Sequence, residues 1–304
     1  MTRKRKNDGA ALNSPLIRRP IKHCFALFLL PTFAAFCIGF LYPFAKGIFL
    51  SFCKFKLTKD WTWVGFSNYV KAFQDNSFAH AFWYTALFAV VSLLLINILA
   101  FAVAYALTRG IRGTNLFRTV FFMPNLIGGI VLGYIWSMIF DGILSRYGTS
   151  ILLNSTYGFW GLIILMCWQQ IGYMMIIYIA GLQAVSEDML EAAKIDGASG
   201  WKSLWHITIP NMMPSFTICT FLTLTNSFKL FDQNLALTNG RPFIQSGGET
   251  IKTTEMLALN IVNAFYANNT NRGVGQAKAV IFFILVAAIG LIQLRATRSR
   301  EVQQ

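Results

Sequence analysis

The stretch AFWYTALFAVVSLLLINILAFAVAYALT, residues 81–108, contains no Asp, Glu, Lys or Arg. A helix needs about 20 consecutive apolar residues to cross the hydrocarbon core of a bilayer, so this stretch is long enough to cross with some tilt. A helix also satisfies its own backbone hydrogen bonds, which lipid cannot do for it. Residues 81–108 therefore predict a transmembrane helix.

Five further stretches with few or no charges repeat this pattern. They cover residues 24–45, 119–140, 159–185, 207–230 and about 276–295. The fourth span in chain order begins near Phe159, because Asn154, Ser155, Thr156 and Gly158 indicate a loop before it. The chain is therefore expected to cross a membrane six times.

The fifth and sixth spans have distinctive starts. Pro210 and Pro214 stand at the start of the fifth span, where the first helical turn has backbone N–H groups to spare. The uncharged part of the sixth span is short, because Lys278 and Arg295 flank it. Either both cations snorkel towards water or the helix begins near Val274.

The overall composition supports a membrane protein. Hydrophobic side chains make up 55% of the chain and charged ones 12%, with a mean hydropathy of +0.53. A soluble globule could not bury so much apolar surface. We expect an all-α integral membrane protein with a basic tail over residues 1–22 and one six-span domain over residues 23–300.

Lys and Arg are distributed unevenly around the predicted spans. An even number of spans places both termini on one side, and this side carries the larger group of cations: Arg3, Lys4, Arg5, Lys6, Arg18, Arg19, Lys22, Arg109, Arg112, Arg118, Lys194, Lys202, Arg295, Arg298 and Arg300. Cytoplasmic segments retain more Lys and Arg, so both termini are expected in the cytoplasm. Because these cations flank spans, the formal net charge of +14 indicates topology and anionic lipid rather than nucleic acid.

The cysteine and histidine patterns exclude several kinds of site. The five cysteines form no CxxC pair, and His23, His80 and His206 are isolated from one another and from acidic clusters. No metal site and no nucleophile with its base is therefore expected. The sequence also lacks a phosphate-binding GxxxxGK motif followed by Ser or Thr. We expect no catalytic residue, metal or cofactor on this chain.

The predicted cytoplasmic loop 187–210 has the pattern of two helices joined by a turn. Residues 188–195 favour a helix, and Gly197 can adopt a positive φ and end it. Residues 198–209 then restart an amphipathic stretch, for which Asp196 is a candidate N-cap. Its apolar side chains are expected on one face: Trp201, Leu204 and Trp205. Such a face either binds a protein partner or lies on lipid.

Residues 191–210, EAAKIDGASGWKSLWHITIP, resemble the EAA loop of permeases in binding-protein-dependent, ATP-driven importers. The residues at the family's spacing are Glu191, Ala192, Ala193, Asp196, Gly197, Ala198, Ile207 and Pro210. Ile209 departs from the pattern, since leucine is commoner there. FRTVFFMP at 117–124, GLQAV at 181–185 and LTNGRP at 237–242 are similar to the sugar branch, and the resemblance covers about residues 21–300.

This resemblance implies a type I ABC importer permease fold with six spans and a cytoplasmic EAA coupling helix, in the cell (inner) membrane of a prokaryote. It implies that the chain imports a sugar, expected to be an oligosaccharide, by alternating access. The chain would form half of a heterodimer with a second homologous permease. Two copies of a cytoplasmic ATPase, which bind ATP and Mg, and an extracytoplasmic sugar-binding protein would complete the importer, so the chain itself is not an enzyme.

The resemblance also assigns roles to the ATPase-coupling residues of the EAA loop. Glu191 would offer a carboxylate to a basic residue of the ATPase, and Gly197 would supply the sharp turn. Ala192 and Ala193 would permit close approach. Pro210 belongs to the same motif.

Polar residues within spans either hold helices together or line the transport path. The resemblance to maltose permeases places the sugar contacts at Gln169, Gln170 and Tyr173 in the fourth span and near Leu222 and Asn226 in the fifth. Gln169 and Tyr173 share one helical face. For Asn226, a direct sugar contact and a hydrogen bond between helices are both open.

The loop before the sixth span is expected to lie outside the cell. Residues 240–275 contain a predicted helix over 254–267 and form a plausible landing surface for the binding protein. At the end of the fifth span, Lys229 and Asp232 are expected to pair on one helical face.

Two other functions remain alternatives. An ion-coupled secondary transporter would be expected to carry acidic residues within spans and internal repeats, and neither is evident in the sequence. A membrane-embedded enzyme would require convergent catalytic groups at one membrane depth, and none converge.

Overall fold

The computed structural model describes residues 20–246, 248–267 and 271–298, so residues 1–19 of the predicted tail lie outside it. The chain divides into two compact units between Leu50 and Ser51. The first unit is a continuous helix made of three segments: α1 (Pro20–Phe36), the π-helical η1 (Cys37–Leu41) and α2 (Tyr42–Ser51). From Phe28 to Ser51 this helix is long and apolar enough to cross a membrane.

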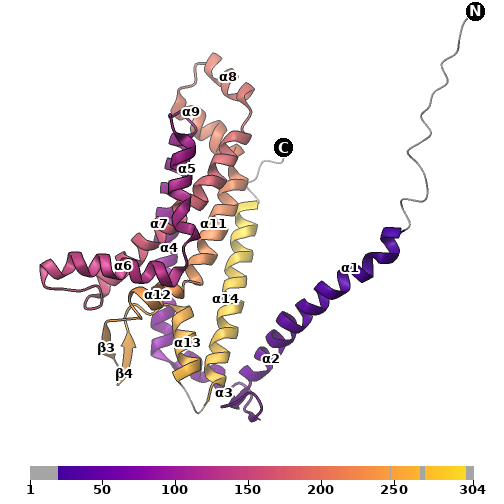
Figure 1. Ribbon diagram of the computed structural model, residues 1–304, viewed down its shortest axis with the longest axis vertical. Coiled ribbons are helices and arrows are strands. Elements are labelled where there is room, and N and C mark those ends of the chain that lie inside the picture. Colours follow the sequence, from indigo (N-terminus) through magenta and orange to yellow (C-terminus); the bar gives the residue numbers. More distant parts are fainter. Residues whose placement is uncertain (1–19, 247, 268–270, 299–304) are drawn as a thin grey trace, which may run out of the picture. The chain divides into compact units, whose positions relative to one another are not determined.

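Four long helices of the second unit run side by side (Figure 1). They are α4 (Asn76–Leu107), α7 (Ser155–Ala184), α11 (Met213–Phe228) and α14 (Gly273–Arg298). The start of α14 agrees with the alternative in which the sixth span begins near Val274. α7 begins earlier than predicted, because the Asn154 side chain accepts a hydrogen bond from the Thr156 N–H at 2.8 Å and caps the helix. Residues 155–158 are therefore helical rather than a loop.

The predicted span 119–140 consists of two helices that meet at 101° rather than one straight helix. The elements are α5 (Thr114–Phe122), the 3-10 turn η2 (Met123–Leu126), α6 (Gly129–Leu144) and the 3-10 turn η3 (Ser145–Tyr147). Ile127 and Gly128 are extended, with ψ of 133° and 139°, and this interrupts the helix. As a result, α6 projects away from the four long helices (Figure 1).

A second bend of 70° precedes α11, so the predicted range 207–230 also spans a break. The elements before the bend are α9 (Gly200–Ser203), the π-helical η4 (Leu204–Thr208) and α10 (Ile209–Asn211). Pro210 and Pro214 lie in the first turns of α10 and α11, as predicted. Among the described residues, four helices are long and apolar enough to cross a membrane, or up to six if each bent pair counts as one span.

The short elements of the second unit lie at opposite ends of the long helices (Figure 1). One end, the α8 end, carries α8 (Glu187–Ile195) and α9. The other, the hairpin end, carries α3, α13 and the β3–β4 hairpin, while α12 lies beside α6. The short elements outside the α8 end are β1 (Cys53–Phe55), β2 (Trp61–Trp63), α3 (Ser67–Gln74), α12 (Asp232–Leu237), β3 (Phe243–Ser246), β4 (Glu249–Lys252) and α13 (Leu257–Ala267).

Both strand pairs are antiparallel two-stranded sheets. β1 pairs with β2 so that Lys54 lies opposite Thr62, and β3 pairs with β4 so that Ile244 lies opposite Ile251. The helix predicted over 254–267 begins at Leu257, because residues 253–256 bond to the base of the β3–β4 hairpin instead.

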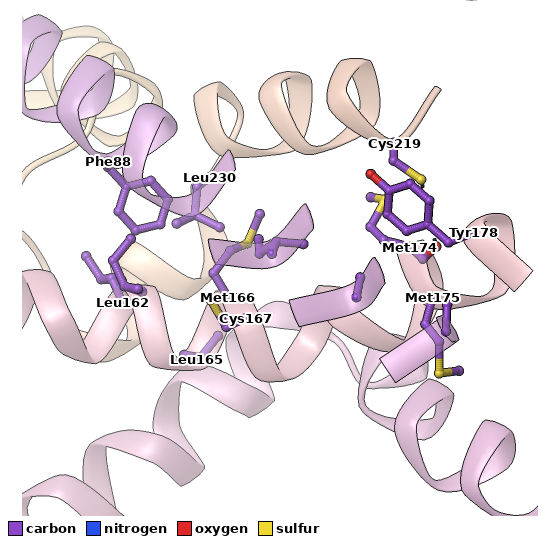
Figure 2. Packing of buried hydrophobic residues seen from close by; sticks show 14 of the residues in the cluster. Phe88, Leu162, Leu165, Met166, Cys167, Met174, Met175, Tyr178, Cys219 and Leu230 are labelled. Carbon is purple, nitrogen blue, oxygen red and sulfur yellow. Dashed lines mark hydrogen bonds between the residues drawn. The ribbon is translucent and has the colours of Figure 1, made fainter. Parts of the chain in front are cut away.

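The core lies between α4, α7 and α11. Figure 2 shows Phe88 and Leu162 at one end of this packed cluster and Tyr178 beside Cys219 at the other. Within this core, four polar side chains form hydrogen bonds between helices, and we name them the polar seam: Ser92, Asn97, Tyr178 and Ser227. The Tyr178 hydroxyl donates to Asn97 Oδ1 at 2.7 Å, and the hydroxyls of Ser92 and Ser227 lie 2.8 Å apart.

Two tyrosines of this core provide a matched pair of variants. Tyr178 hydrogen-bonds Asn97, whereas the buried Tyr84 hydroxyl has no hydrogen-bond partner among the described residues. We expect Tyr178→Phe to destabilise the protein by about 1–2 kcal/mol, because it leaves Asn97 Oδ1 unpaired, and Tyr84→Phe to be neutral or stabilising. Thermal unfolding of both variants in detergent would check this. Equal effects of the two substitutions would contradict the importance of the seam.

Candidate functional site

The loop 187–210 folds as two helical segments joined at Gly197. After α8, the Ala198 N–H donates to the Ala193 carbonyl at 2.9 Å and the Gly197 N–H to the Lys194 carbonyl at 3.1 Å. This is the Schellman pattern of helix termination. Gly197 has a φ of +78°, which confirms the prediction that it turns the chain.

Asp196 is not the N-cap of the second segment. It ends α8 and is exposed, whereas the Ser199 side chain accepts a hydrogen bond from the Lys202 N–H at 3.4 Å and caps α9. The sequence analysis had named Asp196 as the candidate N-cap. Ser199 directly precedes the first residue of α9, which is the N-cap position.

The EAA-like residues differ in their exposure. Glu191 and Ala192 are exposed on α8, while Ala193 is buried at 7% exposure and supports the turn. Glu191 therefore lies on the surface of the loop 187–210, where a partner can reach its carboxylate. Pro210 is half-buried at the start of α10.

The predicted common face of Trp201, Leu204 and Trp205 is wrong. The two tryptophans are 69% and 51% exposed and their rings lie 5.7 Å apart, but Leu204 is buried at 7% exposure. The α-helical spacing ends at Leu204, where the π-helical η4 begins, and there the two indoles form an exposed pair while Leu204 is buried. Ile195, at 87% exposure, adds a further exposed apolar side chain to the loop.

A cleft of about 580 Å³ separates this loop from the ends of α4 and α7. Arg109 lies at its α4 side with the guanidinium 4.4 Å from the centre of the Tyr105 ring. Glu187 and Lys194 line it from α8, and Leu204 from η4. Leu190 and Ile207 of the loop nevertheless pack against the core of the long helices, so the cleft separates only part of the loop from them.

Side-chain amides from three helices of the second unit form two hydrogen-bonded pairs. We name this set the amide cluster: Gln169 and Gln170 of α7, Asn226 of α11 and Gln233 of α12. The Gln233 amide donates to Gln169 Oε1 at 2.7 Å, and the Asn226 amide donates to Gln170 Oε1 at 3.3 Å. Gln169 in turn donates to the Ile127 carbonyl at 3.3 Å.

The structure thus brings together three of the five residues predicted to contact the substrate. Gln169 and Gln170 are buried, at 6% and 8% exposure, and Asn226 is half-buried. In this conformation all three hydrogen-bond to other parts of the chain, so Asn226 makes the hydrogen bond between helices that sequence analysis left open. Tyr173 and Leu222 are half-buried and pack against the hydrophobic core.

Gln233 was missed by the sequence analysis. It belongs to a short helix beyond the predicted fifth span, where hydropathy gives no signal. The pair expected from Lys229 and Asp232 does not form, because α11 ends at Phe228 and α12 begins at Asp232, so the two residues lie on different helices. Among the described residues, the ion pairs are Lys252 with Glu255 and Lys278 with Asp75.

A buried ionic cluster ties the helices together at the hairpin end. Lys278 of α14 is 1% exposed and its ammonium lies 2.6 Å from Asp75 Oδ2 and 3.0 Å from Asn260 Oδ1. Asn260 also donates to Glu255 Oε2 at 2.7 Å, and Lys252 Nζ lies 3.5 Å from Glu255 Oε1. Lys278 therefore does not snorkel to water. In the described part of the chain, no group of three or more His, Cys, Asp or Glu side chains could hold a metal ion.

Comparisons with known proteins found a matching family model and several relatives. A family model described as "Binding-protein-dependent transport system inner membrane component" matches residues 109–299. The probable starch degradation products transport system permease protein AmyD of Thermoanaerobacterium thermosulfurigenes is 40% identical over 285 residues, covering 91% of this chain and 94% of that protein. The multiple sugar-binding transport system permease protein MsmF of Streptococcus mutans is 28% identical over 276 residues, with 87% and 92% coverage.

A solved structure is similar over nearly the whole chain. It is that of a bacterial alginate ABC transporter in complex with an alginate pentasaccharide-bound periplasmic protein, with a TM-score of 0.74 and 20% identity. The likeness covers 92% of this chain and 96% of that one. At this identity the likeness shows the fold alone.

Proposed function

This chain belongs to the family of inner membrane components of binding-protein-dependent transport systems, and we propose that it forms part of the pore of an ATP-driven importer for an oligosaccharide. It has the type I ABC permease fold and, as a permease subunit, is not itself an enzyme. The observation that carries the proposed cargo is the 40% identity to a permease for starch degradation products over nearly the full length of both chains.

The loop 187–210 is the proposed point of contact with the ATPase. Its exposed surface combines the Glu191 carboxylate with Trp201, Trp205 and Ile195, which suits a partner groove that has basic and apolar sides. The cleft behind the loop leaves room for the loop to move when two ATPase subunits close. Motion of the loop would then tilt α7, which precedes it in the chain, and α11, which follows it.

The amide cluster is the proposed place of sugar contact. Amides offer both donors and acceptors to hydroxyl groups, and they are costly inside a membrane unless they are paired or functional. In the described conformation they pair with one another, so we propose that sugar hydroxyls replace these bonds when the path opens. Tyr173 and Leu222 would border the same path.

The remaining parts of the importer follow from this proposal. A second homologous permease would complete the pore, and ATP and Mg would bind to the two ATPase copies. An extracytoplasmic binding protein would dock at the hairpin end, where Phe243 and Ile244 are 52% and 46% exposed. Both termini and the α8 end would then face the cytoplasm.

Uptake of labelled maltotriose into membrane vesicles tests the proposed function. The vesicles contain the chain with its sister permease, its ATPase and its binding protein. We expect uptake only with ATP inside and binding protein outside, and no effect from collapsing ion gradients. Uptake that follows an ion gradient without ATP would instead support the secondary transporter.

A further inference from the structure

α12 is fastened to the base of the β3–β4 hairpin by one buried side chain. Asn234, at 0% exposure, donates to the Thr254 carbonyl at 2.8 Å and to Thr238 Oγ1 at 3.0 Å, and its Oδ1 accepts the Met256 N–H at 3.0 Å. Thr254 in turn donates through its hydroxyl to the Arg241 carbonyl at 2.6 Å. Both amide hydrogens and the amide oxygen of Asn234 are therefore used.

The residue before Asn234 reaches the amide cluster. Gln233 donates to Gln169 Oε1 at 2.7 Å, which joins α12 to α7. α12 also packs closely on α6, because a Cβ at Gly133 would lie 2.5 Å from the Ala236 Cβ. A short helix held this tightly on two sides can shift only as a whole.

We infer that Asn234 is a positioning residue through which α12 links the hairpin to the amide cluster. This inference rests on the proposed function, in which a loaded binding protein docks at the hairpin end. A displacement of the hairpin base moves residues 254–256, and the three Asn234 bonds carry that displacement to α12. Gln233 then moves relative to Gln169, which frees the amides for sugar hydroxyls.

Burial explains why the link is stiff. Because Asn234 is shielded from water, breaking any of its bonds leaves an unsatisfied buried polar group, which is unfavourable. The hairpin base therefore keeps its bonds and transmits movement instead of slipping past α12. Glu255 lies within the same segment and is connected through Asn260 to Lys278 of α14.

A double-mutant cycle tests the inference in the assembled importer. The variants are Asn234→Leu, Gln169→Leu and the pair together, with Asn234→Asp as the conservative control that keeps the acceptor for Met256. The readouts are stimulation of ATP hydrolysis by maltotriose-loaded binding protein and the KM and kcat of uptake. Hydrogen exchange of residues 232–237, of residues 254–256 and of the part of α7 around Gln169 is measured on the same samples.

We expect Asn234→Leu to lower stimulation by about tenfold while hydrolysis without binding protein changes by less than about twofold. Asn234→Asp should be intermediate, and the double variant should be no worse than the worse single one, because both break one link. Additive effects in the cycle, or equal losses with and without binding protein, would overturn the inference and leave only a structural role for Asn234.

Failure of the proposed function has a different signature. If the wild-type importer transports no sugar, the exchange measurement still decides the inference. A link predicts that Gln169→Leu speeds exchange at 254–256 and that Asn234→Leu speeds it at Gln169 and its neighbours. If the hydrogen-exchange rate rises only next to each substitution, the inferred link between the hairpin and the amide cluster is wrong, whichever substrate is transported.

Discussion

A chain carrying Glu191→Ala together with Gly197→Val is expected to insert in the membrane but to lose the coupling between ATP hydrolysis and transport. Stimulation of hydrolysis by loaded binding protein should fall by at least about tenfold, and uptake should fall with it. Glu191 is exposed on α8, so its replacement removes a carboxylate offered to the ATPase without disturbing the packing of the chain. Hydrolysis and uptake in vesicles, with inserted protein quantified, check this.

The effect of Gly197→Val comes from the backbone. Gly197 has a φ of +78°, and a Cβ built there meets nothing within 4 Å, so there is room for a side chain but a poor conformation for one. A β-branched residue in this region costs about 1–3 kcal/mol. The turn is therefore expected to rearrange, and α8 would no longer present Glu191 in the same place.

Two nearby substitutions control for this interpretation. Gly197→Asn should retain coupling, because asparagine tolerates the left-handed region. Gly200→Ala changes a glycine of the same loop that begins α9 without a positive φ, and it should be neutral. If Gly197→Val couples as well as these two, or if transport persists without ATP, the loop is not the coupling element and the ion-driven alternative gains support.

Features that depend on local sequence were predictable. The stretch 81–108 lies almost wholly within α4, because a long uncharged stretch needs no tertiary information to favour a helix in lipid. The turn at Gly197 was likewise predictable, since a glycine between two amphipathic stretches is the usual helix end. Both features are determined by residues that are adjacent in the sequence.

The bend between η2 and α6 was not predicted, because hydropathy measures length and polarity but not direction. Residues 119–140 contain no charge, yet the helix breaks at Ile127 and Gly128. Pro124 and the glycine pair that begins at Gly128 were signals that could have found it. The break matters, because the Ile127 carbonyl that it frees accepts the Gln169 amide.

The contacts of the amide cluster and the ionic cluster were not predictable either. Lys278 and Asp75 are 203 residues apart in the chain, and Gln233 is 64 residues from Gln169. No periodicity links such positions in a single sequence. The sequence offered two alternatives for Lys278, snorkelling to water or an earlier helix start, but not its partner: the Asp75 carboxylate at the start of α4 lets Lys278 remain buried.

Lys278→Met is expected to destabilise the protein by about 3 kcal/mol, which is the lower end of the range for breaking a buried ion pair. The lower end applies because the Asp75 side chain is 30% exposed. Methionine fills a similar volume, so the loss is electrostatic: Asp75 loses its cation, and Asn260 Oδ1 loses a donor. The midpoint of thermal unfolding in detergent measures this change.

A second variant separates the ion pair from the packing around it. In Lys278→Met with Asp75→Asn, neither charge remains, and asparagine can still accept the Ser77 and Phe78 N–H groups that Asp75 Oδ1 holds at 2.8 and 3.1 Å. Replacing both members of a buried pair is often near neutral, so the double variant should recover more than half of the lost stability. Lys252→Met, which removes a 29% exposed cation 3.5 Å from Glu255, should cost less than about 1 kcal/mol. If the double variant is no more stable than Lys278→Met, the two charges do not interact as the geometry indicates, and Lys278 contributes through its aliphatic chain and its contact with the Phe78 ring.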